Sequence, residues 1–307
     1  MLNILGKRYI FFGLSLLLIL PGMLILLISG IPLAIDFTGG SLLEVKFSDS
    51  NMPQPSQVIT LLNDIGLTDA QVSSTADNSL IIRTIFLNEE KRSDVLSTLK
   101  NQIDSELVVQ RFDSVGPTIG QEVAQRAALA VGLAALGVVL YIFFAFRGVA
   151  HSIRYGICAI LAELHDVLVI ISIIAIGAKF FGWQVDSLFL TALLTVIGFS
   201  VQDTIVVFDR IRENSNIYKK LDFETLVNHS IVQTLMRSIN TQLMTSEFLL
   251  LSLVLIGGVT LREFSFILLI GLLMGTYSSI FIAAPILVVW ENKEWRYWFR
   301  GKRPTTA

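Results

Sequence analysis

Six long apolar stretches divide the chain, and polar segments of different lengths separate them. A transmembrane helix needs about 20 consecutive, mainly apolar residues, and each stretch reaches that length. The predicted spans are residues 10–34, 127–146, 155–178, 187–208, 238–261 and 264–290. We therefore expect a multi-pass α-helical membrane protein with six transmembrane helices.

The first apolar stretch follows Lys7 and Arg8 and runs without a charge from Tyr9 to Ile35. The core of a signal peptide is about 7–15 residues long and ends at a cleavage site of small residues. This stretch is longer, and no A-x-A pattern ends it. We expect it to be retained as the first transmembrane helix.

Residues 36–118 form the one long polar segment, and their apolar positions follow strand and helix periods in turn. Strands are predicted at residues 41–48, 70–75, 79–86 and 106–113, helices at 55–66 and 89–103, and a hairpin turn at Asp77-Asn78. The order βαββαβ is that of a ferredoxin-like split motif. We expect an α+β ferredoxin-like domain, large enough to hold a small core of its own.

Lysine and arginine in the connecting segments predict the orientation, because they gather on the cytoplasmic side. One side of the membrane would hold Lys7, Arg8, Arg147, Arg154, Arg210, Arg212, Lys219, Lys220, Lys293, Arg296, Arg300, Lys302 and Arg303. The short loops on the other side hold only Lys179 and Arg262. Both termini are therefore expected in the cytoplasm, and the α+β domain outside it. The predicted parts are an N-terminus with the first helix (1–35), the extracytoplasmic domain (36–118), helices two to six (119–292) and a cytoplasmic tail (293–307).

The composition agrees with lipid as the solvent. Hydrophobic residues make up 53% of the 307 residues and charged residues 16%, whereas soluble domains carry about 25% charged residues. The net charge of −2 predicts no nucleic-acid partner, because phosphate binding needs a clustered basic surface. The three histidines and the single cysteine lack the spacing of metal ligands. No nucleophile–base pair appears, so we expect neither a metal nor an enzyme.

Ionisable residues inside the predicted spans are the candidate functional groups, because a charge in hydrocarbon is costly unless it is paired or hydrated. Glu163 and Asp166 lie three positions apart in the third span and should project from one face of the helix. Asp203 lies in the fourth span near Gly198, which would permit a close helix contact. Arg237 lies at the cytoplasmic edge of the fifth span.

These groups suggest proton coupling. Desolvation favours the neutral form of a buried carboxyl group, and a neighbouring cation favours the charged form. An Asp203 that gains and loses Arg237 as a neighbour would therefore bind and release a proton. Two alternatives remain open. The carboxyl groups of Asp203, Glu163 and Asp166 would equally serve as hydrogen-bonding groups between helices, and Arg237 as a residue that sets topology.

Turn-forming residues mark the two junctions between membrane and domain, Gly39-Gly40 and Gly116-Pro117. One interpretation is a tight connection. The other is a pair of hinges about which the outer domain swings. The sequence does not decide between them.

Five motifs together resemble the SecF family of the bacterial protein-export machinery. They are IDFTGG (35–40), VGPTIG (115–120), ELHDV (163–167), IGFSVQDTIVVFDRIREN (197–214) and TLMRSINTQLMTS (234–246). The resemblance implies a subunit that pairs with SecD in a twelve-helix body similar to RND transporters. It further implies association with the SecYEG translocon, with YajC and YidC, and with unfolded exported polypeptide in the inner membrane. The energy source would be the proton motive force, with no cofactor.

By matching position, the resemblance makes Asp203 the proton-carrying carboxylate, Arg237 its partner and Asp166 a supporting group. Some residues depart from the family pattern: Glu163, Gln202, Gln242, Met244 and Glu247. Glu163, an additional carboxylate, is a hypothetical second proton station. The alternative function is a subunit of an RND-type exporter of small molecules or lipids. Such pumps usually have twelve helices in one chain and two larger outer domains.

Overall fold

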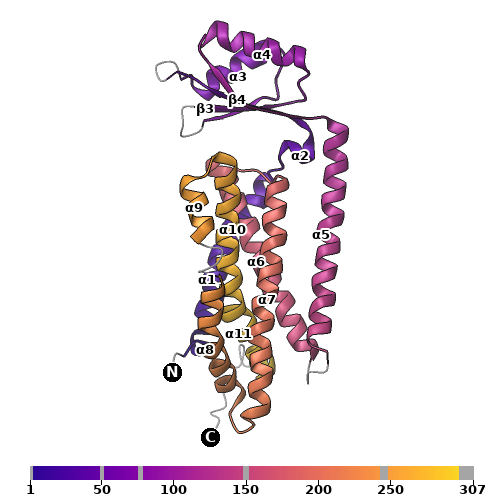
Figure 1. Ribbon diagram of the computed structural model, residues 1–307, viewed down its shortest axis with the longest axis vertical. Coiled ribbons are helices and arrows are strands. Elements are labelled where there is room, and N and C mark those ends of the chain that lie inside the picture. Colours follow the sequence, from indigo (N-terminus) through magenta and orange to yellow (C-terminus); the bar gives the residue numbers. More distant parts are fainter. Residues whose placement is uncertain (1–2, 49–51, 75–78, 148–151, 243–247, 297–307) are drawn as a thin grey trace. The chain divides into compact units, whose positions relative to one another are not determined.

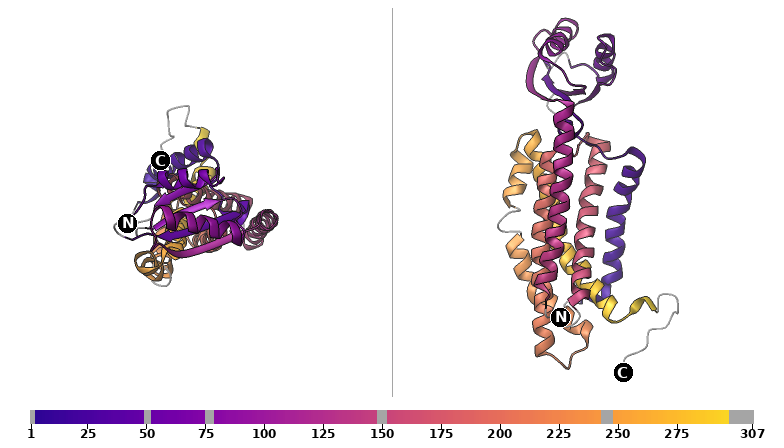
Figure 2. Two further views of the ribbon diagram at one scale, coloured as in Figure 1. Left: turned by 90° about the horizontal axis from the view of Figure 1, so that it is seen from above. Right: turned by 90° about the vertical axis from the view of Figure 1, so that its right-hand side faces the viewer.

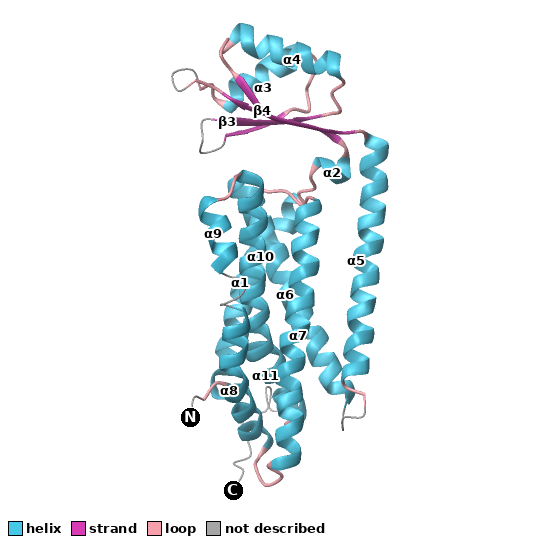
Figure 3. Cartoon of the chain, in the orientation of Figure 1, coloured by secondary structure: helices cyan, strands magenta, loops and turns pink. Residues whose placement is uncertain are grey.

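The computed structural model describes residues 3–48, 52–74, 79–147, 152–242 and 248–296. The chain divides into two compact units. One is mainly helical and comprises Met1–Ile31, Val131–Trp183 and Leu188–Ala307. The other holds all described strands and comprises Pro32–Ala130 with Gln184–Ser187 (Figure 3).

Five helical segments in the described part of the chain are long and apolar enough to cross a membrane: Leu5–Ser29, Pro117–Ala145, Ser152–Phe181, Ser187–Ile217 and Leu261–Glu291. The helices are α1 (Arg8–Ser29), α5 (Pro117–Ala145), α6 (Ser152–Phe181), α7 (Ser187–Ile217), α8 (Phe223–Gln242), α9 (Phe248–Ile256), α10 (Val259–Ser278) and α11 (Ala284–Glu291) (Figure 1). The five apolar segments named first confirm the predicted spans one, two, three, four and six.

The predicted span 238–261 covers the end of α8, residues 243–247 outside the described part, and α9. Both α8 and α9 pack against α10, and they follow one another along the helical unit in Figure 1 and in the right-hand view of Figure 2. The span itself stays a prediction.

Helix α7 is longer than predicted, because its polar end continues past residue 208. Ion pairs at i,i+3 spacing stabilise this extension. Arg210 pairs with Glu213 at 2.5 Å, and Arg212 pairs with Asp209 at 2.6 Å. Asp209, Arg212 and Glu213 are exposed, so this end of α7 is solvated.

Helices α1 and α6 meet closely around Gly22 and Ser172. A Cβ atom on Gly22 would overlap Ser172, so glycine is what permits the approach. Pro21 has no backbone N–H and disturbs the preceding turn. The hydroxyl group of Ser172 donates to two carbonyl oxygens of that turn, Leu18 at 2.9 Å and Ile19 at 3.0 Å.

The last span is not a continuous α-helix. A π-helical turn, η3 (Ser279–Ala283), joins α10 to α11. Pro285 follows this turn and cannot donate to the carbonyl group four residues earlier, so a regular ladder of hydrogen bonds is interrupted here. Widened turns of this kind are frequent at functional sites.

A buried arginine ties together three ends of the helical unit. The side chain of Arg8, at the start of α1, is 2% exposed. It donates to Glu224 in the first turn of α8 at 2.8 Å and also pairs with Glu294 in η4 (Glu294–Arg296). Tyr9 donates its hydroxyl group to Glu294 at 2.6 Å.

The smaller unit contains a four-stranded antiparallel sheet. Its elements are α2 (Ile35–Thr38), β1 (Gly40–Lys46), α3 (Pro55–Asp64), β2 (Gln71–Ser74), β3 (Ser79–Thr84), α4 (Glu89–Gln102) and β4 (Val108–Val115). The strand order is β2-β3-β1-β4, with Ser41 opposite Thr84 and Gly40 opposite Val115. The predicted order βαββαβ is confirmed, and the predicted turn at Asp77-Asn78 lies outside the described residues.

Helices α3 and α4 cover one face of this sheet (Figure 3). Alternate strand residues point to the helices, since successive side chains of a strand face opposite sides. The core consists of Leu43, Val45, Leu80 and Ile82 from the strands, Val58 and Leu62 from α3, and Val95 and Leu99 from α4. The domain therefore has its own hydrophobic core.

Candidate functional site

The candidate site is a buried cluster of polar side chains between α6, α7 and α10. Asp166 lies at its centre and is 0% exposed. One carboxylate oxygen, Oδ2, accepts hydrogen bonds from Ser200 on α7 at 2.5 Å and from Ser278 on α10 at 2.6 Å. The other oxygen, Oδ1, lies 2.9 Å from Nδ1 of His165. A single carboxyl group therefore joins three helices.

His165 extends the cluster toward α1. Its ring stacks on Tyr277, with centroids 6.1 Å apart. The hydroxyl group of Tyr277 donates to the carbonyl oxygen of Phe11 at 2.9 Å and accepts from Ser15 at 3.2 Å. Four helices of the unit thus contact one polar network.

Asp203 also contacts α10, close in sequence to the residues of this network. It is 6% exposed, and its Oδ2 accepts a hydrogen bond from Thr276 at 3.3 Å. Thr276 stands two residues before Ser278, the residue that holds Asp166. The structure therefore places the predicted carboxylates Asp166 and Asp203 against one short segment of α10.

Small residues permit this close approach of α7 and α10. A Cβ atom on Gly271 would overlap Val196, and one on Gly275 would lie 3.1 Å from Cβ of Ser200. Among the described residues the predicted close contact at Gly198 is wrong, because a Cβ atom there would meet none of their atoms within 4 Å. The G-x-x-x-G spacing of Gly271 and Gly275 is the sequence signal that would have identified the contact.

Ser278 and Thr276 are functional candidates that the sequence prediction missed. They belong to a run of small and hydroxyl-bearing residues, GTYSS at 275–279, inside an otherwise apolar span. Such residues at lipid depth are potential hydrogen-bonding groups between helices. That run is the only local signal for them.

Glu163 lies one turn before Asp166 on α6, on the same face as predicted. It is 7% exposed, and neither carboxylate oxygen has a hydrogen-bond partner among the described residues. Burial of a polar group without a hydrogen bond is costly. A proton-binding role for Glu163 stays a prediction.

Arg237 lies on α8 with an exposed side chain. The structure brings Glu163, Asp166 and Asp203 into one unit. The pairing of Asp203 with Arg237 remains a prediction, and Glu247 and Met244 lie outside the described residues.

The two predicted junction motifs pack against each other within the smaller unit. Gly39 and Gly40 have φ values of 73° and 131°, which favour glycine. A Cβ atom on Gly39 would lie 2.8 Å from Cα of Pro117, and one on Gly120 would lie 2.6 Å from N of Gly39. A Cβ atom on Gly116 would meet no atom of the described residues within 4 Å. This packing is that of a tight connection, and hinge motion stays a prediction.

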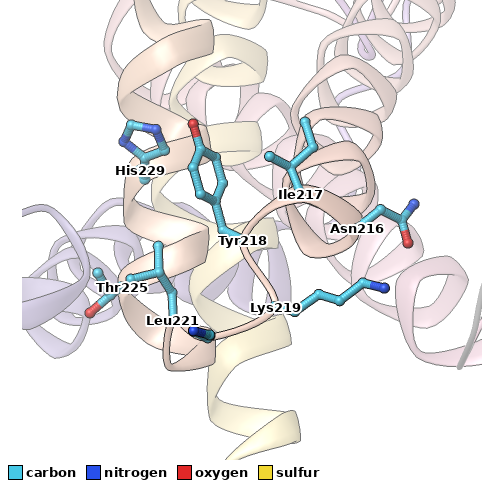
Figure 4. A pocket seen from close by; sticks show the side chains of 8 residues that line it. Asn216, Ile217, Tyr218, Lys219, Leu221, Thr225 and His229 are labelled. Atoms are coloured by element: carbon cyan, nitrogen blue, oxygen red, sulfur yellow. The ribbon is translucent and has the colours of Figure 1, made fainter.

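A hollow of about 770 Å³ lies at the turn between α7 and α8 (Figure 4). Tyr218 and His229 stand edge to face within it, with ring centroids 5.5 Å apart. Lys219 and Lys220 line its rim. Its lining residues do not include Glu163, Asp166 or Asp203, and its two lysines add positive charge to this end of the helices.

Comparison with known proteins identifies the family. The family described as protein export membrane protein SecD/SecF, C-terminal, matches residues 95–293, and the SecD/SecF GG motif matches residues 24–50. The protein translocase subunit SecF of Anaerolinea thermophila is 63% identical over 308 residues, covering 100% of both chains. The chain belongs to the SecD/SecF family. The SecF subunit of Thermobaculum terrenum is 46% identical and covers 100% of this chain and 99% of its own.

The SecD/SecF fold is confirmed by solved structures. The crystal structure of SecDF, a translocon-associated membrane protein from Thermus thermophilus, superposes with a TM-score of 0.82 at 29% identity. The match covers 95% of this chain and 39% of the SecDF chain. A super-membrane-facing form of SecDF gives a TM-score of 0.67 over 96% of this chain and 39% of the other. This SecF-type chain is thus a subunit of the Sec protein translocase, which belongs to a family of transporters and not of enzymes. The alternative of an RND-type exporter of small molecules or lipids is superseded.

Proposed function

We propose that this SecF-type subunit works with SecD and uses the proton motive force to assist the export and release of polypeptides. The observation that carries the proposal is the contact of two buried carboxylates, Asp166 and Asp203, with neighbouring hydroxyl groups of α10. A change of charge at either carboxylate alters hydrogen bonds that hold separate helices together. Protonation is thereby linked to helix packing.

Asp203 is the proton carrier in this proposal. When it is neutral, hydrogen bonds such as the one from Thr276 stabilise it at lipid depth. When it is charged, the cost of an ion in hydrocarbon favours the approach of a cation. Arg237 on α8 is that cation, so loss of the proton would draw α8 toward α7. The exposed position of Arg237 is compatible with an arm that moves.

Asp166 and Glu163 support this cycle. Serine hydroxyl groups rotate and can donate to a carboxylate or accept from a carboxylic acid. Ser200 and Ser278 therefore allow Asp166 to change its protonation state without losing both partners. Glu163, one turn away on α6, serves as a second proton station on the same face.

The membrane topology proposed for the subunit has six crossings, with α8, residues 243–247 and α9 forming the fifth. This is half of a twelve-helix, RND-like body completed by SecD. Both termini lie in the cytoplasm, and the sheet domain lies on the outer side of the inner membrane. Lys219 and Lys220 at the α7–α8 turn support this orientation through the positive-inside rule.

The remaining partners follow from the family. SecYEG supplies the channel, YajC and YidC join the assembly, and unfolded polypeptide contacts the sheet domain. Movement of that domain about Gly39, Gly40, Gly116 and Pro117 would transmit the work of the proton cycle. No bound cofactor enters this scheme, because the gradient itself is the energy source.

The test compares Asp203→Asn with a matched control, Asp209→Asn, in secretion with and without a proton gradient. Asp209 lies on the same helix but at its exposed, solvated end. We expect Asp203→Asn to abolish the gradient-dependent part of export and Asp209→Asn to preserve it. Full gradient dependence in Asp203→Asn would refute the proposal.

A further inference from the structure

The first residue of α7, Ser187, is held by the acidic side chain of Asp36, which lies 151 positions earlier in the sequence. Oδ2 of Asp36 accepts a hydrogen bond from the backbone N–H of Ser187 at 3.0 Å and from its hydroxyl group at 2.6 Å. The first N–H groups of a helix have no partner inside the helix. For Ser187 that partner comes from a residue 151 positions earlier.

Backbone hydrogen bonds join the same two segments. The N–H of Ala34 donates to the carbonyl oxygen of Val185 at 2.9 Å, and the N–H of Val185 donates to that of Pro32 at 2.7 Å. Leu33 and Val185 thus form a short parallel bridge. Together with Asp36, these bonds fasten the segment that precedes α7 to the segment that leads into the sheet.

Asp36 is close to the sheet as well as to α7. It lies in the single turn of α2, four residues before β1, which pairs with both β3 and β4. Between them stands Gly39, whose backbone packs tightly against Pro117 and Gly120. Because this connection is short and closely packed, a displacement of Asp36 should also displace the central strand β1.

In the other direction, α7 leads to the candidate proton carrier. Asp203 follows Ser187 by sixteen residues on one continuous helix, a distance of about 24 Å. A carboxylate at a helix N-terminus is stabilised by the helix dipole, and hydrogen bonds to a charged group are stronger than neutral ones. Asp36 is thus a firm attachment point for α7.

We propose that Asp36 is a positioning residue that transmits displacement of α7 to the sheet domain. The proposal rests on the proposed function, because the approach of α7 and α8 that follows loss of the Asp203 proton must first displace α7. It assigns to Asp36 the mechanical step between proton binding and movement of the part that contacts polypeptide. Removal of the Asp36 carboxylate should uncouple the movement of the sheet domain from that of α7. The response of α7 itself to the proton gradient should not change.

The test uses two fluorescent reporters in the complete SecD–SecF complex in vesicles. In a Cys158→Ala background, Asn216→Cys labels the exposed end of α7, and Gln102→Cys labels an exposed position of α4 in the sheet domain. A proton gradient is imposed, and the change in each signal is recorded. In the otherwise unaltered complex we expect both reporters to respond.

Asp36→Ala should leave the Asn216→Cys response unchanged and reduce the Gln102→Cys response at least about fivefold, since two hydrogen bonds are lost. Asp36→Asn keeps an acceptor but loses the charge, so an intermediate response is expected. Asp203→Asn should silence both reporters. If it does not, the proposed function fails, independently of Asp36.

Asp69→Ala is the matched control. Asp69 accepts from the Thr84 hydroxyl group at 3.1 Å and from the N–H of Ile85 at 2.7 Å, the same pair of donor types within the sheet domain. The Asp69→Ala variant should leave the responses of both reporters unchanged.

If Asp36→Ala does not fold, the same measurements are made with Asp36→Asn and Ser187→Ala. A full Gln102→Cys response in folded Asp36 variants would overturn the proposal.

Discussion

Asp166 and Ser278 stand 112 positions apart in the sequence, and the hydroxyl group of Ser278 donates to Oδ2 of Asp166 at 2.6 Å. This bond joins α6 to the end of α10, where the helix widens into the π-turn η3. Ser200 donates to the same oxygen, so the carboxylate lies between two hydroxyl groups. The contact makes the packing of the last span depend on an ionisable group.

Ser278→Ala should destabilise the helical unit, because Asp166 loses one of its donors. An intramolecular hydrogen bond contributes about 0.5–1.5 kcal/mol, so a loss of about 1 kcal/mol is expected in thermal unfolding of the purified complex. Ser279→Ala is the control, since Ser279 donates only to the carbonyl oxygen of Thr276 in its own helix. Equal stability of the two variants would contradict the role of Ser278.

Gly271→Ala should separate α7 from α10, because a Cβ atom there overlaps Val196. Overpacking of this kind costs about 1–3 kcal/mol. Gly198→Ala meets open space and should be neutral or stabilise by up to about 1 kcal/mol through helix propensity. The free energies of unfolding of the two variants, compared with that of the parent chain, test this prediction. If only Gly198→Ala lost stability, the close helix contact would lie at Gly198 and not at Gly271.

Much of the fold could be predicted because it depends on local patterns. Apolar length identified α1, α5, α6 and α7, and period-two alternation identified the strands of the sheet. The shared face of Glu163 and Asp166 followed from helix geometry. Partners across helices could not be predicted, since nothing local couples Ser278 to Asp166. Gly198 was wrongly chosen for the same reason.

Glu163→Met should stabilise the helical unit, since a buried carboxyl group without a partner among the described residues is replaced by an apolar side chain of similar length. The expected gain is about 1–3 kcal/mol, the cost of burying a polar group without a hydrogen bond. As a second proton station, Glu163 should also shape the pH dependence of export. Glu163→Gln isolates that role, and an unchanged pH profile would reject it.

Acid should loosen the cluster of Arg8, Tyr9 and Glu294. Burial alone would raise the pKa of Glu294, but hydrogen bonds from Tyr9 and Arg8 and the charge of Arg8 outweigh it and hold the pKa below its ordinary value of 4.5. A lowered pKa contributes stability that is present above the ordinary value and is lost as the pH falls through the lower one.

Unfolding of the complex at a series of pH values checks this prediction. Stability should decline below about pH 4.5, and Glu294→Gln should flatten that decline because its amide does not titrate. Glu89→Gln is the control, since Glu89 is exposed and pairs only with Arg92 at i,i+3 spacing. An acid decline that is identical in Glu294→Gln and the parent chain would exclude Glu294 as its source.

The central claim is that Asp203 exchanges a proton while it is buried in the helical unit. Infrared difference spectra of the SecD–SecF complex between high and low pH record the C=O stretch of carboxyl groups that become protonated. We predict that Asp203→Asn removes one such band and that Asp209→Asn leaves the buried-carboxyl bands unchanged. A spectrum of Asp203→Asn that still shows every carboxyl band of the parent complex would contradict the account.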